Sequence, residues 1–123
     1  MNKEIMFQEI ESLTRTLDFI QEEQTFIKRK LSSLLENVVV NDLLAWAEVL
    51  HQEILNRETA IQLLRGDIIA IRNQVKIKKS INNIVDSDVV IAFKKNKQQV
   101  GYIESEFYKW KNLANDKFET ALY

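Results

Sequence analysis

The chain has 123 residues, 46% of them hydrophobic and 28% charged, which suits one globular domain and excludes a disordered tail. Two Gly and no Pro leave too few turn-forming residues for a sandwich or barrel of many short strands, so a mostly helical fold is expected. The lack of Cys in the sequence excludes disulfides, thiolate zinc sites, iron–sulfur clusters and cysteine nucleophiles.

The formal net charge of −1 is unevenly distributed along the chain. Residues 1–60 carry six basic and eleven acidic side chains, residues 61–100 carry eight and three, and residues 101–123 carry three and four. No uncharged apolar run approaches the roughly 18–20 residues of a membrane-spanning helix. Charged side chains among the first ten residues do not fit a secretory signal. We therefore expect a soluble, cytoplasmic protein with no membrane span.

A heptad repeat of apolar side chains predicts a first helix over residues 2–36. The apolar positions alternate in steps of four and three, which is typical of coiled-coil packing, and Gln24 occupies one position where an apolar residue belongs. At ~1.5 Å per residue this helix is roughly 50 Å long. The apolar members of the repeat are Met6, Ile10, Leu13, Leu17, Ile20, Ile27, Leu31 and Leu34.

A second heptad repeat predicts a helix over residues 43–79, after a reversal at residues 37–42, where three Val residues are bracketed by Asn and Asp. Arg57 is its one polar interruption. Apolar side chains also flank this repeat, and the resulting surface is too wide for one neighbour, so the second helix should be central. The repeat comprises Leu43, Ala47, Leu50, Ile54, Ile61, Leu64, Ile68, Ile71 and Val75, and its flanks carry Leu44, Trp46, Val49, Leu55, Leu63, Ile69 and Ala70.

A third heptad repeat predicts a helix over residues 88–121. The segment 80–93 before and at its start is ambiguous, because its Asn and Asp residues favour helix ends whereas its β-branched residues favour a strand, so a short extended piece is an alternative there. Asn96 and Lys117 are polar members of the repeat. Its apolar members are Phe93, Val100, Ile103, Phe107, Trp110, Ala114 and Ala121.

Three helices of similar length joined by short links predict an all-α fold. We expect residues 1–123 to form a single domain, an elongated antiparallel three-helix bundle with coiled-coil-like heptad packing. In the number and length of its helices this arrangement resembles the spectrin-type three-helix repeat, although the sequence holds no residue motif of that family.

Polar residues interrupt the three repeats at levels that an antiparallel arrangement brings together. We expect Gln24, Arg57 and either Asn112 or Asp116 to form a hydrogen-bonded layer across the apolar core, since a buried polar group without a partner costs ~1–3 kcal/mol. Such a layer would also fix the register of the helices. The alternative is that Arg57 extends along its aliphatic stem to solvent.

Glu48 and His51 form an E-x-x-H pair, which resembles half of the ligand set in ferritin-like di-iron bundles. The sequence has only one His, and the expected register places Lys28 and Lys30 near it, where cations would repel a metal ion. From the third helix, only Glu119 reaches this level. A carboxylate–histidine metal site shared by two copies is therefore a distant alternative, and no cofactor or metal is expected. Because no glycine-rich phosphate loop and no recognisable Ser–His–Asp grouping is present, no enzyme activity is expected either.

A cluster of basic residues flanks the second reversal, so the bundle should gather them at one tip. A phosphate backbone or an anionic lipid surface would favour such a tip, which makes a polyanion or nucleic-acid binder the alternative function. The sequence pI near 5.9 argues against a dedicated nucleic-acid binder. The cluster comprises Arg72, Lys76, Lys78, Lys79, Lys94, Lys95 and Lys97.

The second helix carries more apolar surface than two neighbours would cover, which favours association of the whole domain. The leading hypothesis is a non-enzymatic helical interaction or scaffold module that self-associates, most simply as a two-fold dimer. Exposed Trp, Tyr and Leu side chains concentrate where partners meet. The candidate interface residues are Leu44, Trp46, Leu55, Leu63, Tyr102 and Tyr108.

Overall fold

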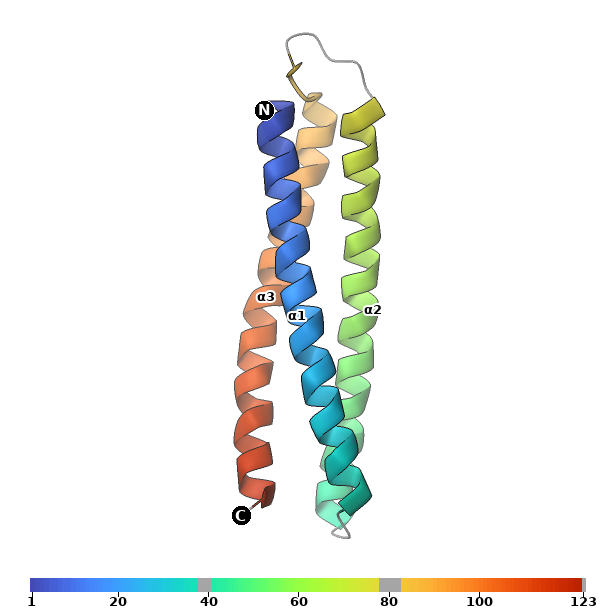
Figure 1. The fold of residues 1–123 in the computed structure, drawn as a ribbon, viewed down its shortest axis with the longest axis vertical. Coiled ribbons are helices and arrows are strands. Elements are labelled where there is room, and N and C mark those ends of the chain that lie inside the picture. The colour runs from blue at the N-terminus through green and yellow to red at the C-terminus, as the bar shows by residue number, and fades with distance from the viewer. Residues whose placement is uncertain (38–40, 78–82, 123) are drawn as a thin grey trace.

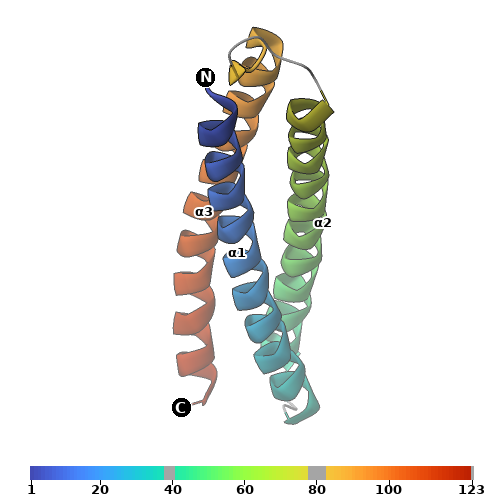
Figure 2. The same ribbon diagram turned by 45° about the horizontal axis from the view of Figure 1, so that its top comes forward.

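The computed structural model describes residues 1–37, 41–77 and 83–122, which form three long helices (Figure 1). These are α1 (Lys3–Asn37), α2 (Asn41–Ile77) and α3 (Ser87–Leu122). Successive helices run in opposite directions and lie side by side in both views (Figures 1 and 2), so the fold is an elongated antiparallel three-helix bundle. The expected all-α fold is confirmed, and each observed helix end differs from the expected one by one or two residues.

Asn2 and the segment before α3 hold the start of the bundle together. The Oδ1 atom of Asn2 accepts a hydrogen bond from the backbone N–H of Glu4 at 2.7 Å, which satisfies a free donor in the first turn of α1. The backbone N–H of Val85 donates to the carbonyl of Met1 at 2.8 Å, and Asn2 forms a β-bridge with Ile84. Backbone hydrogen bonds therefore hold the residues just before α3 against the N-terminus of the chain.

The short extended piece considered for residues 80–93 is confined to the residues just before α3, within the described part of that segment. The isolated bridge at Ile84 is its only extended pairing there, and α3 already begins at Ser87. Asn83 has a φ of 62°, a left-handed conformation that Asn tolerates well and that turns the chain before the helix. Val89 and Phe93 are buried four residues apart, so packing of a helical face outweighs the strand propensity of the β-branched residues.

The heptad repeats form the core. Nearly all of their described apolar members are buried, while Leu13, Leu34 and Ile103 are half-buried against the core. Of the polar members, Asn96 is buried and Lys117 is exposed. The side chains of Leu43 and Ala121 lie outside the described residues. Three buried residues fall outside the predicted repeats: Val85, Val89 and Phe118.

Polar contacts between the helices define their register. Between α1 and α3, which run in the same direction, Lys97 pairs with Glu9 at 3.1 Å and Lys111 with Glu23 at 3.1 Å, each pair 88 residues apart. Residues of α2 and α3 that face each other have numbers that add up to about 163. Examples are the edge-on rings of Trp46 and Phe118, with centroids 5.4 Å apart, and the hydrogen bond from Trp110 to Glu53 at 2.8 Å.

Between α1 and α2, Arg65 of α2 bridges two residues of α1. Its guanidinium lies 2.7 Å from a carboxylate oxygen of Asp18 and donates to the side-chain oxygen of Gln21 at 2.8 Å. Lys28 pairs with Glu58 at 3.3 Å further along the same helix pair. These partly exposed ion pairs each add only up to ~1 kcal/mol of stability. They do show which residues of α1 and α2 lie at the same height along the bundle.

Candidate interaction surface

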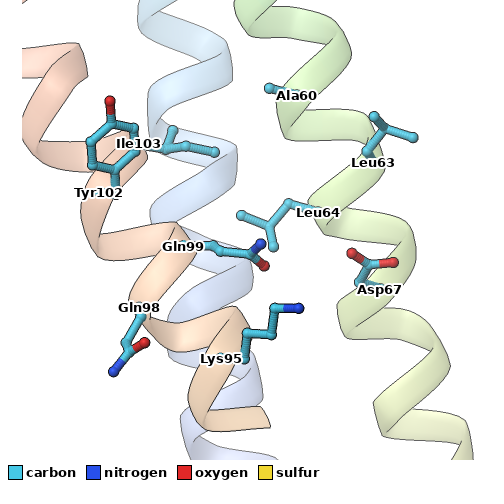
Figure 3. Close-up of a pocket in the computed structure, with 9 residues that line it drawn as sticks. All are labelled: Ala60, Leu63, Leu64, Asp67, Lys95, Gln98, Gln99, Tyr102 and Ile103. Atoms are coloured by element: carbon cyan, nitrogen blue, oxygen red, sulfur yellow. The ribbon is translucent and has the colours of Figure 1, made fainter. Parts of the chain in front are cut away.

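A long groove runs between α2 and α3, and we call it the α2–α3 groove. Three adjoining pockets of about 700, 380 and 560 Å³ follow one another along it. The groove follows α2 from Trp46 to Asp67, which at ~1.5 Å per residue is roughly 32 Å. Figure 3 shows the largest pocket, which is lined by Ala60, Leu63, Leu64, Asp67, Lys95, Gln98, Gln99, Tyr102 and Ile103.

The small side chain of Ala60 helps to keep this groove open. In Figures 1 and 2, α2 diverges from α1 toward its C-terminal end. Leu64 and Ile103 point toward one another from the two helices and form the apolar floor of the groove (Figure 3). Ala60 adds only a methyl group to the α2 wall, so a neighbouring side chain could enter the groove beside it.

Exposed apolar side chains lie on both walls of the groove or next to it. Leu63 on α2 is 69% exposed and Tyr102 on α3 is 68% exposed, and both line the largest pocket. Val49, two heptads before Leu63, and Leu113 are also exposed. Exposed apolar side chains that lie along a groove among charged residues are typical of an interaction site.

The candidate interface residues divide into two groups. Leu63 and Tyr102 line the groove, and Trp46 lines its far end while packing edge-on against Phe118. The remaining three do not line the groove: Leu44 is half-buried, and Leu55 and Tyr108 are exposed.

Sequence reasoning missed several groove residues because they belong to a second repeat of mixed polarity. On α2 this repeat again steps by four and three, but charged or amide side chains occupy about half of its positions, so hydrophobic periodicity alone does not reveal it. Its members that line the groove are Glu53, Asn56, Ala60, Leu63 and Asp67.

Trp110 organises the middle of the groove. Its indole Nε1–H donates to Glu53 Oε2 at 2.8 Å, and the guanidinium carbon of Arg57 lies 5.1 Å from the centre of its ring. The indole is buried, and the carboxylate satisfies its only donor. The two charged side chains are therefore held on this part of the α2 wall.

The expected polar layer does not form. Both side-chain polar atoms of Gln24 are buried without a hydrogen-bond partner, so neither Arg57 nor a residue of α3 bonds to this amide. Arg57 is half-buried and lies over Trp110 instead. Asn112 and Asp116 are exposed, because the residues of α3 that face the core at this level are apolar. The interpretation of Gln24 as a core residue holds, but its partners are absent.

The basic cluster contains residues in different surroundings. Lys97 pairs with Glu9 of α1 at 3.1 Å, and Lys95 shares the groove with Asp67. The carboxylate of Glu9 thus reduces the positive potential that a polyanion would meet at Lys97. Asp67 lies across the groove from Lys95 without pairing with it. The other described members, Arg72, Lys76 and Lys94, are exposed, while Lys78 and Lys79 lie outside the described residues.

The carboxylate–histidine pair lies on the surface of α2. Glu48 and His51 are exposed, as is Glu119 on α3. Within residues 1–37, 41–77 and 83–122, no group of three or more His, Cys, Asp or Glu side chains could hold a metal ion. Lys28, which was expected near His51, pairs with Glu58 one heptad further along α2.

The comparisons with known proteins add no assignment. The chain matches no protein-family model, and no curated protein or solved structure is significantly similar to it. None of the helices in the described part of the chain is long and apolar enough to cross a membrane.

Proposed function

We propose that this protein is a non-enzymatic helical interaction module that self-associates as a dimer through the α2–α3 groove. The observation that carries the proposal is the exposure of Leu63 and Tyr102 on opposite walls of a groove about 32 Å long, at ~1.5 Å per residue of α2. We place this association in the cytoplasm, as the sequence suggests.

Energetics support burial of this face. Leu63 and Tyr102 each leave most of their side chain in water, and covering a large apolar side chain contributes ~1.5–3 kcal/mol. The charged and amide side chains along the rim would remain at the edge of a helix–helix contact and keep their hydration. Such a surface suits another amphipathic helix better than a small ligand, because the groove is shallow and elongated.

The polyanion-binding alternative has weaker support. Arg72, Lys76 and Lys94 are exposed, but Lys97 is paired with Glu9, and Lys95 lies in a groove that also carries Asp67 on its opposite wall. Binding to nucleic acid that weakens steeply with salt would favour this alternative over the dimer.

Light scattering at several protein concentrations tests the proposal. We expect the molar mass to rise with concentration from 14.5 kDa toward twice that value, and Leu63→Glu to hold it at 14.5 kDa because two carboxylates would be buried. Ile69→Glu is the matched control, since Ile69 is also exposed on α2 but does not line the groove. A wild-type mass of 14.5 kDa at every concentration would contradict the proposal.

A further inference from the structure

The α2–α3 groove carries charges of opposite sign at the same level on its two walls. Asp67 of α2 lies level with Lys95 of α3, and Arg57 lies level with Glu106, in the register that the Trp110 hydrogen bond defines. The pattern repeats at Glu53 and Lys109, which line the last of the three pockets. Three charges on each helix thus have a complementary charge near their own level on the other. Within one chain, Glu106 already pairs with Lys109 at 3.5 Å and Glu53 accepts the hydrogen bond of Trp110, which leaves Asp67 and Lys95 as the pair without such partners.

Asp67 and Lys95 do not satisfy each other within one chain. Both line the largest pocket, and Figure 3 shows the ammonium group of Lys95 reaching from α3 toward the α2 wall. In the described part of the chain neither side chain takes part in an ion pair. The width of the groove separates them, so each remains available to a helix that enters it.

We propose that a second copy of this chain fills the groove with the same face, related by a two-fold axis that runs along the bundle. This inference rests on the proposed function and specifies its geometry. Rotation about such an axis keeps every residue at its own level and places α3 of one copy against α2 of the other. Lys95 then meets Asp67 of the second copy, and this pair is formed twice. Glu106, which pairs with Lys109 of its own helix at 3.5 Å, lies level with Arg57 of the second copy.

The charges disfavour a two-fold axis that crosses the helices at right angles. Such an axis, placed at Ala60 in the middle of the groove, would put α2 against α2 of the second copy and α3 against α3. Each pair of helices would run antiparallel, so a residue before Ala60 would face a residue the same distance after it. Asp67 would face Glu53 of the second copy, because each lies seven residues from Ala60. Lys95 would face the region of Lys109 in the same way. Like charges placed opposite each other across an interface oppose association.

The apolar residues fit the proposed axis as well. At equal levels Tyr102 lies against Leu63 of the second copy, and Leu113 against Val49, so the four most exposed apolar side chains of this face pair with one another. Two helices about 10 Å wide over ~32 Å cover roughly 600 Å² on each copy, or ~1,200 Å² in total, which reaches the lower limit for a specific interface. The net charge of −1 causes little repulsion between two copies.

Cysteine cross-linking distinguishes the axes, and the lack of native Cys gives a clean background. We would mix Leu63→Cys with Tyr102→Cys under mild oxidation and compare the mixture with each variant alone. Because a disulfide requires Cα atoms within about 7 Å, we expect the mixed disulfide as the main product. Dominant disulfides between two copies of Leu63→Cys, or a dimer by mass with no cross-link in the mixture, would overturn this geometry while leaving the proposed dimer intact.

A charge exchange provides the second readout. Asp67→Lys should weaken dimerisation about tenfold in sedimentation experiments, since two lysines would then meet across the interface, and adding Lys95→Asp should restore it. Glu22→Lys, an exposed acid on α1, is the matched control and should leave the dimer unchanged. Equal weakening by the single and the double exchange would overturn the pairing. A wild-type chain that stays monomeric, including one that binds unrelated amphipathic helices instead, would overturn both this inference and the proposed function.

Discussion

Replacing Phe107 with Ala is expected to lower the free energy of unfolding by about 3–5 kcal/mol. Phe107 is fully buried on the heptad face of α3, where its ring centroid lies 6.2 Å from that of Trp110. Deleting the ring removes its transfer free energy and leaves a cavity that the long rigid helices cannot close. Because small domains are stable by only ~5–15 kcal/mol, this one change removes a large part of the total.

Urea denaturation followed by circular dichroism measures this effect. Wild type and variant should be compared at one protein concentration, because self-association would stabilise the folded state by mass action. Tyr108→Ala is the control, since the neighbouring Tyr108 is 46% exposed and should cost far less. A loss below ~1 kcal/mol for Phe107→Ala would mean that this position does not lie in a packed core.

Replacing Gln24 with Leu is expected to raise the free energy of unfolding by about 1–3 kcal/mol. The amide of Gln24 is fully buried, and neither its nitrogen nor its oxygen has a hydrogen-bond partner. Folding therefore removes both atoms from water without replacing their hydrogen bonds. Leu has a similar length, fits the heptad position and needs no partner.

Thermal and urea denaturation of Gln24→Leu would show the gain in stability as a higher midpoint. The slope of the free energy of unfolding against urea concentration should not change. Gln8→Leu is the matched control, because Gln8 lies exposed on the same helix and its replacement should change stability by less than ~0.5 kcal/mol. Loss of stability in Gln24→Leu would show instead that the amide has a partner in solution, such as a trapped water molecule.

The heptad spacing made most of the fold predictable. A step of four and three places apolar residues on one side of a helix, so the buried residues of α2, from Ala47 to Val75, follow directly from the pattern. Val89 and Phe118 were harder to assign. Val89 lies in a segment with strand propensity that helix packing overrides. The third repeat predicts that Lys117 faces the core, but the buried residue is its neighbour Phe118.

The polar layer and the groove depend on side-chain directions that spacing alone does not set. Gln24 and Arg57 lie in helices that pack together, but Arg57 turns toward the ring of Trp110. The α2–α3 groove is lined by side chains such as Asp67 and Lys95, which occupy positions that read as ordinary solvated helix faces. The polar layer leaves no signal in hydrophobic periodicity, and the groove leaves only a partial one, the apolar residues Trp46 and Leu63 that flank the second repeat.

Small-angle X-ray scattering tests the central claim most directly, because it reports mass and length together. The chain alone has a mass of 14.5 kDa, and its helices of 35 to 37 residues are ~55 Å long at about 1.5 Å per residue. We expect twice the mass with nearly the same maximum dimension, because the second copy lies alongside the bundle. A particle of 14.5 kDa at all concentrations, or a dimer of nearly doubled length, would contradict association through the α2–α3 groove.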